Sequence, residues 1–215
     1  MADGVKRRTY DSSGRRDAAR ARRQRVLQAA GELFLTDGYP HTTVAAIAQR
    51  AGVSEDLVFA LFTSKRGVLK VVMDVAIGGD DQEIPLLERD GPQALRAATD
   101  QREQVRLFTA GITRQLDRLR PLHDLMRSAA AVEPEIAALH DDLHLRQRRH
   151  AMTMIATWLH QNGPLRHDMT PQTAGAVLWT LASPDVHRML TVQNTWTSEQ
   201  FQDWLAEALV ATLLP

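Results

Sequence analysis

The spacing of apolar residues predicts helices along almost the whole chain. Apolar positions recur three and four residues apart, as one face of an α-helix requires, and the alternation typical of a half-buried strand is absent. The pattern begins with an expected helix over residues 17–36, whose apolar stripe is Val26, Leu27, Ala30, Leu33 and Phe34. The pair Asp37-Gly38 is expected to end this helix. The chain is therefore predicted to be all-α.

Three shorter helices are expected between residues 42 and 79. Each follows a hydroxyl side chain that can cap its first turn, namely Thr42 or Thr43, Ser54 and Ser64. Gly52 permits the backbone turn between the first two of these helices. Two short helices joined in this way are typical of a helix-turn-helix, whose second helix enters the major groove of DNA. The same spacing also occurs in helical hairpins of other all-α proteins.

Longer helices are expected in the rest of the chain. Residues 80–92 are acidic and contain two prolines and a glycine, so they are expected to form a loop. The helices predicted after this loop cover residues 93–118, 121–131, 134–162, 171–192 and 198–213. The predicted domains are a flexible basic arm (1–16), a helix-turn-helix domain (17–70) and a larger helical domain (71–215).

Charge is distributed unevenly, although it sums to zero over the chain. Residues 1–70 carry 13 Lys/Arg against 7 Asp/Glu, a net of +6, whereas residues 71–215 carry 13 against 19, a net of −6. An anionic partner is thus expected for the first part alone. The sequence has no cysteine and no apolar run near the roughly 20 residues of a membrane span, so a cytoplasmic protein without a membrane partner is expected.

One segment resembles a known family. Residues 42–69, TTVAAIAQRAGVSEDLVFALFTSKRGVL, preceded by RRQRVLQAAGELFLTDGYPHTT, are similar to the TetR/AcrR family of bacterial one-component transcriptional regulators. The resemblance covers about residues 22–70, and the last two expected helices match more loosely. It implies an N-terminal three-helix helix-turn-helix domain and a larger C-terminal helical domain for ligand binding and dimerisation. In such a homodimer, ligand binding changes the distance between the two DNA-binding domains, and the protein then dissociates from its operator.

The resemblance also implies which residues contact DNA. The expected set is Arg15, Arg16, Arg22, Arg23, Thr42, Thr43, Ser54, Glu55, Asp56, Leu57, Phe59, Ala60 and Lys65. Phe59 stands where the family often has Tyr, Leu61 where it often has His, and Asp56 where it often has a small residue. Glu55 and Asp56 could accept hydrogen bonds from cytosine or only stabilise the helix N-terminus, and both interpretations stay open. The basic arm is expected to supply the phosphate contacts that these departures remove.

A ligand pocket and a dimer interface are expected in the second domain, because polar residues on otherwise apolar helix faces need partners. The predicted pocket residues are Arg102, Val105, Phe108, Thr109, Ile112, Met126, Gln147, His150, Met154, Trp158 and Trp179. Plain core packing would explain each of them singly. The predicted dimer interface is Val177, Leu178, Leu181, Phe201, Trp204, Leu205, Ala208 and Leu209, although these helices could equally close the monomer's own core.

Enzymatic and metal-binding functions are not expected. His140 and His144 stand four residues apart, a spacing that can share a metal, but Asp141 occupies the position where a zincin needs Glu. Both histidines are interpreted as part of a solvated helix edge. No Gly-rich phosphate loop or nucleophile elbow occurs, so neither catalysis nor a cofactor is expected.

The predicted function is that of a DNA-binding regulator, a repressor released from its double-stranded DNA operator by a small apolar or aromatic effector. The alternative is a TetR-like dimer that binds a ligand or a protein and has lost direct DNA binding. The departures at Glu55, Asp56, Phe59 and Leu61 favour that alternative.

Overall fold

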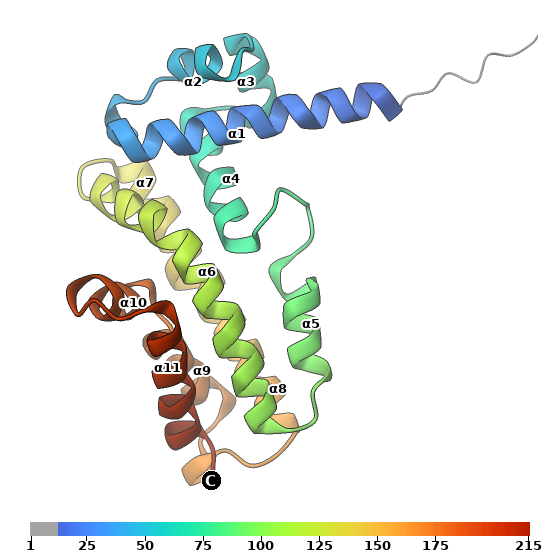
Figure 1. Ribbon diagram of the computed structural model, residues 1–215, viewed down its shortest axis with the longest axis vertical. Coiled ribbons are helices and arrows are strands. Elements are labelled where there is room, and N and C mark those ends of the chain that lie inside the picture. The colour runs from blue at the N-terminus through green and yellow to red at the C-terminus, as the bar shows by residue number, and fades with distance from the viewer. Residues whose placement is uncertain (1–12) are drawn as a thin grey trace, which may run out of the picture.

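The computed structural model describes residues 13–215, and all regular elements within them are helical, as predicted (Figure 1). The first four helices are α1 (Ser13–His41), α2 (Val44–Ala51), α3 (Glu55–Phe62) and α4 (Lys65–Gly78). A short 3-10 helix (Leu86–Glu88) and α5 (Asp90–Ala97) lead into the long helix α6 (Gln101–Ala130). Among these 203 residues, no helix has both the length and the apolar character needed to cross a membrane.

The remaining helices follow α6 in the chain. They are α7 (Pro134–Asp141), a π-helical turn (Asp142–Gln147), α8 (Arg148–Gln161), a 3-10 turn (Arg166–Asp168), α9 (Pro171–Leu181), α10 (Pro184–Arg188), a second π-helical turn (Met189–Gln193) and α11 (Ser198–Leu213). Figure 1 shows α1–α4 at one end of the molecule, here called the head, and α8–α11 at the other end, here called the body. Helix α6 runs between the two ends.

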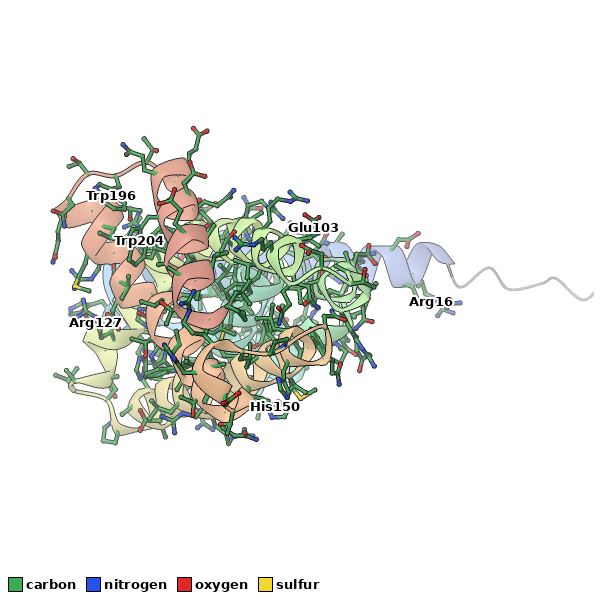
Figure 2. The ribbon with its side chains drawn as sticks, turned by 90° about the horizontal axis from the view of Figure 1, so that it is seen from below. Arg16, Glu103, Arg127, His150, Trp196 and Trp204 are labelled. Atoms are coloured by element: carbon green, nitrogen blue, oxygen red, sulfur yellow. The ribbon has the colours of Figure 1, made fainter. Side chains whose placement is uncertain are left out.

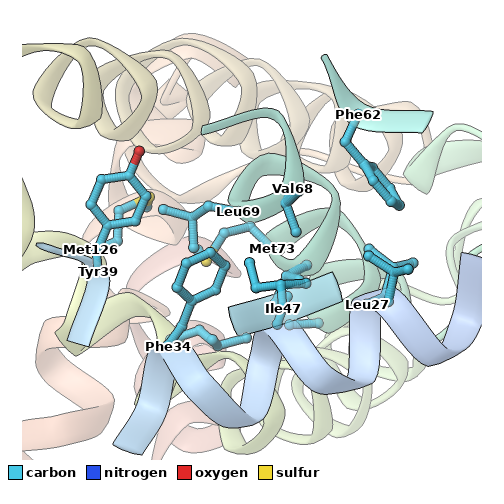
Figure 3. Close-up of a cluster of buried hydrophobic side chains, with 14 of the residues drawn as sticks. Leu27, Phe34, Tyr39, Ile47, Phe62, Val68, Leu69, Met73 and Met126 are labelled. Atoms are coloured by element: carbon cyan, nitrogen blue, oxygen red, sulfur yellow. The ribbon is translucent and has the colours of Figure 1, made fainter. Parts of the chain in front are cut away.

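Helix α6 joins two hydrophobic cores. The first core packs the head against the C-terminal half of α6 and against α7, and Figure 3 shows Phe34, Tyr39 and Leu69 close to Met126 of α6. The second core packs the N-terminal half of α6 against α8, α9 and α11. One helix therefore contributes its apolar face to both ends of the molecule.

The predicted domain boundary at residue 70 falls inside α4. Val72, Met73 and Ala76 lie beyond that boundary and are buried in the first core together with Val68 and Leu69. The head therefore does not end at residue 70, because the apolar stripe of α4 continues for two further turns. This stripe packs against α6 and positions the head on the body.

Helix α1 begins before and ends after the predicted positions. Residues 13–16 were assigned to a flexible arm but belong to the first turn of α1, and residues 1–12 of that arm lie outside the described residues. Gly14 lies in this first turn, and its cost of about 1 kcal/mol does not prevent a helix whose following residues, up to Arg25, are mostly Arg and Ala. At the other end, Gly38 has a φ of 79°, and this kink leads into the segment up to His41.

The predicted helix end at residue 118 is wrong, because α6 continues through Pro121 to Ala130. A proline inside a helix removes one backbone hydrogen bond and costs about 3 kcal/mol. Burial of a large apolar side chain contributes roughly 1.5–3 kcal/mol, and apolar residues on both sides of the proline are buried. These residues are Leu116, Leu119, Leu122 and Met126.

Two of the predicted helices, including the one expected to end at residue 118, are interrupted by a new cap. The range 93–118 breaks after α5, and the carboxylate of Asp100 accepts a hydrogen bond from Glu103 N at the start of α6. The range 171–192 breaks at Ala182, and the hydroxyl of Ser183 caps α10 by accepting from Val186 N. In both cases a short polar side chain competes successfully with helix continuation.

We predict that Gly175→Ala destabilises the body. The new Cβ atom would lie 2.8 Å from Thr153 Cα, a backbone atom of α8 that cannot move away alone. Overpacking of this kind costs about 1–3 kcal/mol. Urea unfolding measures the loss, with Gly111→Ala in α6 as the control because its Cβ would meet nothing within 4 Å. A Gly175→Ala variant as stable as the unchanged protein would contradict the close contact between α8 and α9.

Candidate DNA interface and ligand cavity

Helices α2 and α3 form a helix-turn-helix whose helix ends are fixed by side-chain caps. Thr43 Oγ1 accepts a hydrogen bond from Ala46 N at 3.1 Å, and Ser54 Oγ accepts from Leu57 N at 3.3 Å. Gly52 has a φ of 65°, a left-handed conformation that few other residues adopt without strain. Each cap uses one N–H group, and the other N–H groups of the first turn can face a phosphate.

Helix α3 carries five of the thirteen residues that were expected to contact DNA. Glu55, Asp56 and Ala60 are exposed, and Phe59 is 47 % exposed although it is a large apolar residue. Leu57 is half-buried. Val58 and Phe62 on the opposite face are buried in the first core. The helix therefore presents two acids and an aromatic ring to whatever lies against the head.

The assignment of Thr42 as a phosphate contact is corrected by its burial. Thr42 is 1 % exposed, and its hydroxyl donates hydrogen bonds within the turn, to Gly38 O at 2.8 Å and to Leu33 O at 3.2 Å. Thr43, by contrast, is exposed at the N-cap of α2. Of the two adjacent threonines, only Thr43 can present its side chain to DNA.

Lys65 is held inside the head, which differs from its expected role as a free phosphate contact. Its Nζ donates to Tyr39 O at 2.8 Å and lies 4.2 Å from the centre of the Tyr39 ring. The Tyr39 hydroxyl in turn donates to Glu135 Oε1 of α7 at 3.1 Å. Burial and the hydrogen bond to Glu135 raise the pKa of Tyr39 well above its ordinary value, so the phenol stays neutral. These contacts fix the head on α7.

The expected arginine contacts on α1 separate into two groups. Arg15, Arg16 and Arg22 are exposed, and Figure 2 shows Arg16 on the part of α1 that projects away from the body. Arg23 is half-buried and lies over the Phe62 ring at 5.0 Å. Arg23 also lines a cavity that lies between the head and the body.

That cavity has a volume of about 1440 Å³ and is bounded by α4, residues 80–89, α5, α6 and α8. The volume exceeds the roughly 300–1,000 Å³ of common ligand pockets. Its walls come from both hydrophobic cores. Met73, Leu119, Met126 and Leu143 belong to the first core, and Phe108, Ile112, Met152 and Ile155 belong to the second. The cavity thus lies where the two cores separate.

The predicted pocket residues are only partly brought together. Those that line the cavity are Phe108, Ile112, Met126, Gln147 and His150. Val105, Thr109 and Trp158 are buried in the body instead. Arg102 is exposed, and Met154 and Trp179 are half-buried elsewhere. Some predicted residues lie away from the cavity because α8 packs closely against α9. The periodicity of apolar residues does not tell which face of α8 contacts α9.

Three histidines meet beside the cavity, which corrects the interpretation of His140 and His144 as a solvated edge. Both are half-buried, and their rings pack with that of His123 from α6, with centroids 5.3–5.6 Å apart. Burial lowers the pKa of His123 and of His144 to about 4, so both imidazoles are neutral at pH 7. Within residues 13–215, no three histidine or acidic side chains are arranged to hold a metal ion.

The sequence did not single out His123 and Arg148 as cavity residues. Both line the cavity, together with His144. His123 was hidden because Pro121 was expected to start a new helix, which left the orientation of this segment undefined. No apolar pattern in the sequence marks Arg148 as a pocket residue. Burial lowers the pKa of its guanidinium to about 10. The available signal for Arg148 was its place next to Gln147, which was expected to line the pocket.

Half of the predicted dimer residues belong to the chain's own core. Leu178, Phe201, Leu205 and Leu209 are all 0 % exposed, so they cannot contact a second chain. Val177, Leu181, Trp204 and Ala208 are half-buried and keep some free surface. Trp204 packs edge-to-face with Trp196 at 6.1 Å, and Figure 2 shows the two rings together at one side of the body.

We predict that the protein loses stability as the pH falls from 6.5 towards 4. In this range His123 and His144 take up protons in the unfolded chain, whereas the folded chain holds them neutral. His123→Gln should reduce the slope of unfolding free energy against pH by up to about 1.4 kcal/mol per pH unit. Urea unfolding across this pH range gives the slope, and His160→Gln, at an exposed position, is the control. Equal slopes for His123→Gln and the unchanged protein would contradict the burial of a neutral His123.

Comparison with known proteins agrees with this geometry. Residues 26–72 match the family model described as bacterial regulatory proteins, tetR family. Over 61 residues the chain is 41 % identical to TtgW of Pseudomonas putida, named an uncharacterized HTH-type transcriptional regulator, a match that covers 27 % of this chain and 46 % of that relative.

Solved structures extend the similarity to the whole chain. NalD, the secondary repressor of the MexAB-OprM multidrug efflux pump in Pseudomonas aeruginosa, aligns with a TM-score of 0.65 at 19 % identity over 93 % of this chain and 98 % of NalD. A second solved structure, of a protein from Rhodococcus sp., aligns with a TM-score of 0.65 at 15 % identity over 90 % of this chain and 99 % of its own. Residues 26–72 thus match the N-terminal domain of the tetR family of bacterial regulatory proteins, and the chain as a whole has the fold of the aligned structures.

Proposed function

We propose that this chain is a DNA-binding transcriptional regulator, acting as a repressor that releases its operator when a small, largely apolar molecule enters the cavity. The observation that carries the proposal is that the helices of the head also form the cavity wall. Arg23 of α1, and Val71, Met73 and Asp74 of α4, line the cavity, and both helices pack against α2 or α3. A ligand that changes the packing here acts directly on the position of the head.

The segment between α4 and α5 provides a second connection between cavity and head. Arg89 holds this segment by donating to Gly78 O, Gln82 O and Ile84 O at 3.0–3.2 Å. Asp81 of the same segment forms an ion pair with Arg20 of α1 at 3.7 Å. Because residues 80–89 line the cavity, a ligand that displaces them alters a contact to the basic face of α1.

Dimerisation is part of the proposal. Successive major grooves on one face of DNA lie about 34 Å apart, so two heads must be held at that spacing. The half-buried residues Val177, Leu181, Trp204 and Ala208 of α9 and α11 are the remaining candidates for the contact between two chains. NalD is described as a repressor, which supports repression as the sense of regulation here.

A direct DNA-binding measurement tests the proposal. Fluorescence anisotropy with duplex DNA from the region flanking the protein's own gene should show binding that weakens steeply with salt. Arg22 is exposed on α1, and Arg22→Ala should reduce the slope of log affinity against log salt by about 0.9 for one lost phosphate contact. Arg102→Ala removes the same charge from the N-terminal end of α6, far along that helix from the head, and should leave the slope unchanged.

A second candidate function follows from the exposed face of α3. Glu55, Asp56 and Phe59 are all exposed there, a composition that would suit a protein partner as well as DNA. This alternative is a dimer of the same fold that binds a ligand or a protein and does not bind DNA directly. No binding to any segment of the flanking DNA at low salt would support it and overturn the repressor.

We further predict that Asp81→Asn strengthens DNA binding. The change removes the carboxylate that holds Arg20 of α1, and the freed guanidinium can face the DNA. The gain should reach about fivefold, which corresponds to the upper end of about 0.2–1 kcal/mol for surface ion pairs, because the side chain of Arg20 is 61 % exposed and that of Asp81 is 9 % exposed. Asp90→Asn, which removes an exposed acid from α5, is the control. Weaker DNA binding by Asp81→Asn would contradict this role of the segment.

A further inference from the structure

Two side chains that line the cavity each carry a buried nitrogen atom that no group of the described residues satisfies. His123 is 4 % exposed, and its Nε2 atom is buried without a hydrogen-bond partner among residues 13–215. Nη1 of Arg148 is likewise buried without a partner in that part of the chain. Leaving a buried donor unsatisfied costs about 1–3 kcal/mol, and more for a charged group. Both side chains line the cavity, so a bound molecule can satisfy them.

Arg148 is held in one orientation by Trp179. Its Nη2 donates to Trp179 O at 2.6 Å, and its guanidinium lies 5.5 Å from the centre of the Trp179 ring. The indole Nε1 of Trp179 in turn donates to His144 O at 3.2 Å, which fixes the ring. The Arg148 side chain is therefore already ordered beside the cavity, and preorganisation of this kind favours binding.

The charges around these groups point to an anion. At pH 7 Arg148 is a cation, since its pKa is lowered only to about 10, while His123 and His144 are neutral. Asp185 acts on all three groups at a distance, but the described residues contain no ion pair between Arg148 and an acid. The other charged or titratable groups that act on His123 are His140 and Arg127, which add no negative charge. The buried cation thus lacks a direct counter-ion.

The rest of the cavity is suited to an apolar body. The apolar side chains that line it near α6 and α8 are Phe108, Ile112, Met126, Leu143, Met152 and Ile155. We propose that the cavity binds an apolar molecule bearing a carboxylate, whose oxygens accept hydrogen bonds from Arg148 Nη1 and His123 Nε2. This inference rests on the proposed function in that the cavity is taken as the effector site. A neutral alcohol of the same shape would leave the Arg148 charge without a counter-ion.

Matched pairs of ligands test the proposal on the full chain. Isothermal titration calorimetry compares octanoate with octan-1-ol and 2-naphthoate with 2-naphthol, which separates aliphatic from aromatic bodies. At least one carboxylate should bind roughly tenfold or more tightly than its alcohol, as expected for hydrogen bonds to a charged group. Arg148→Met should remove this preference while changing alcohol binding little. Arg149→Met is the matched control, because Arg149 also lies 5.5 Å from the Trp179 ring but is exposed and does not line the cavity.

A second variant and a measurement of DNA release by each ligand make the outcome unambiguous. His123→Asn, checked for folding by circular dichroism, should also weaken the carboxylate preference, so the proposal does not depend on the stability of Arg148→Met alone. If neither carboxylate binds the unchanged protein more tightly than its alcohol, or if both variants keep the preference, the proposal is wrong. The calorimetry samples contain no DNA, so the ligand preference is measured independently of the repressor proposal. Release of DNA by alcohol and acid alike would retain the repressor and overturn the carboxylate site.

Discussion

The fold depends on one long helix whose apolar face must be covered by two different sets of helices. Leu119, Leu122 and Met126 of α6 are buried by the head and α7, whereas Val105, Phe108 and Ile112 are buried by the body. Pro121 lies within the first of these stretches, between Leu119 and Leu122, and burial on both sides of the proline keeps the helix continuous despite the lost hydrogen bond. Since neither half of α6 can be exposed without losing a core, the position of the head is tied to that of the body.

The cavity is a consequence of this arrangement. Where the two cores separate, their facing side chains line about 1440 Å³ of space instead of packing against one another. Beside this gap the head stays attached to α6 and α7 through the first core, and the hydrogen bond from the Tyr39 hydroxyl to Glu135 of α7 adds a polar contact. A molecule in the cavity therefore touches both cores at once. This is the physical basis for regulation of the head by a ligand.

Sequence reasoning predicted the helical class and the helix-turn-helix, because caps and apolar spacing are local signals. Ser54 and the left-handed Gly52 lie where the sequence placed them. The orientation of each helix about its own axis was not available from those signals. Thr42 and Leu178 were therefore expected at binding surfaces and are buried, while His123 was not expected in the cavity and lines it. Such contacts are decided by packing between distant segments.

The central claim is that head and body form one cooperative unit along α6. The chain's four tryptophans, Trp158, Trp179, Trp196 and Trp204, all lie in the body, so their fluorescence reports unfolding there alone. Hydrogen exchange of the amides of α2 and α3, measured through the same urea titration, reports the head. We expect both probes to give the same midpoint and the same free energy of unfolding. A head that unfolds at clearly lower urea than the body would contradict the account.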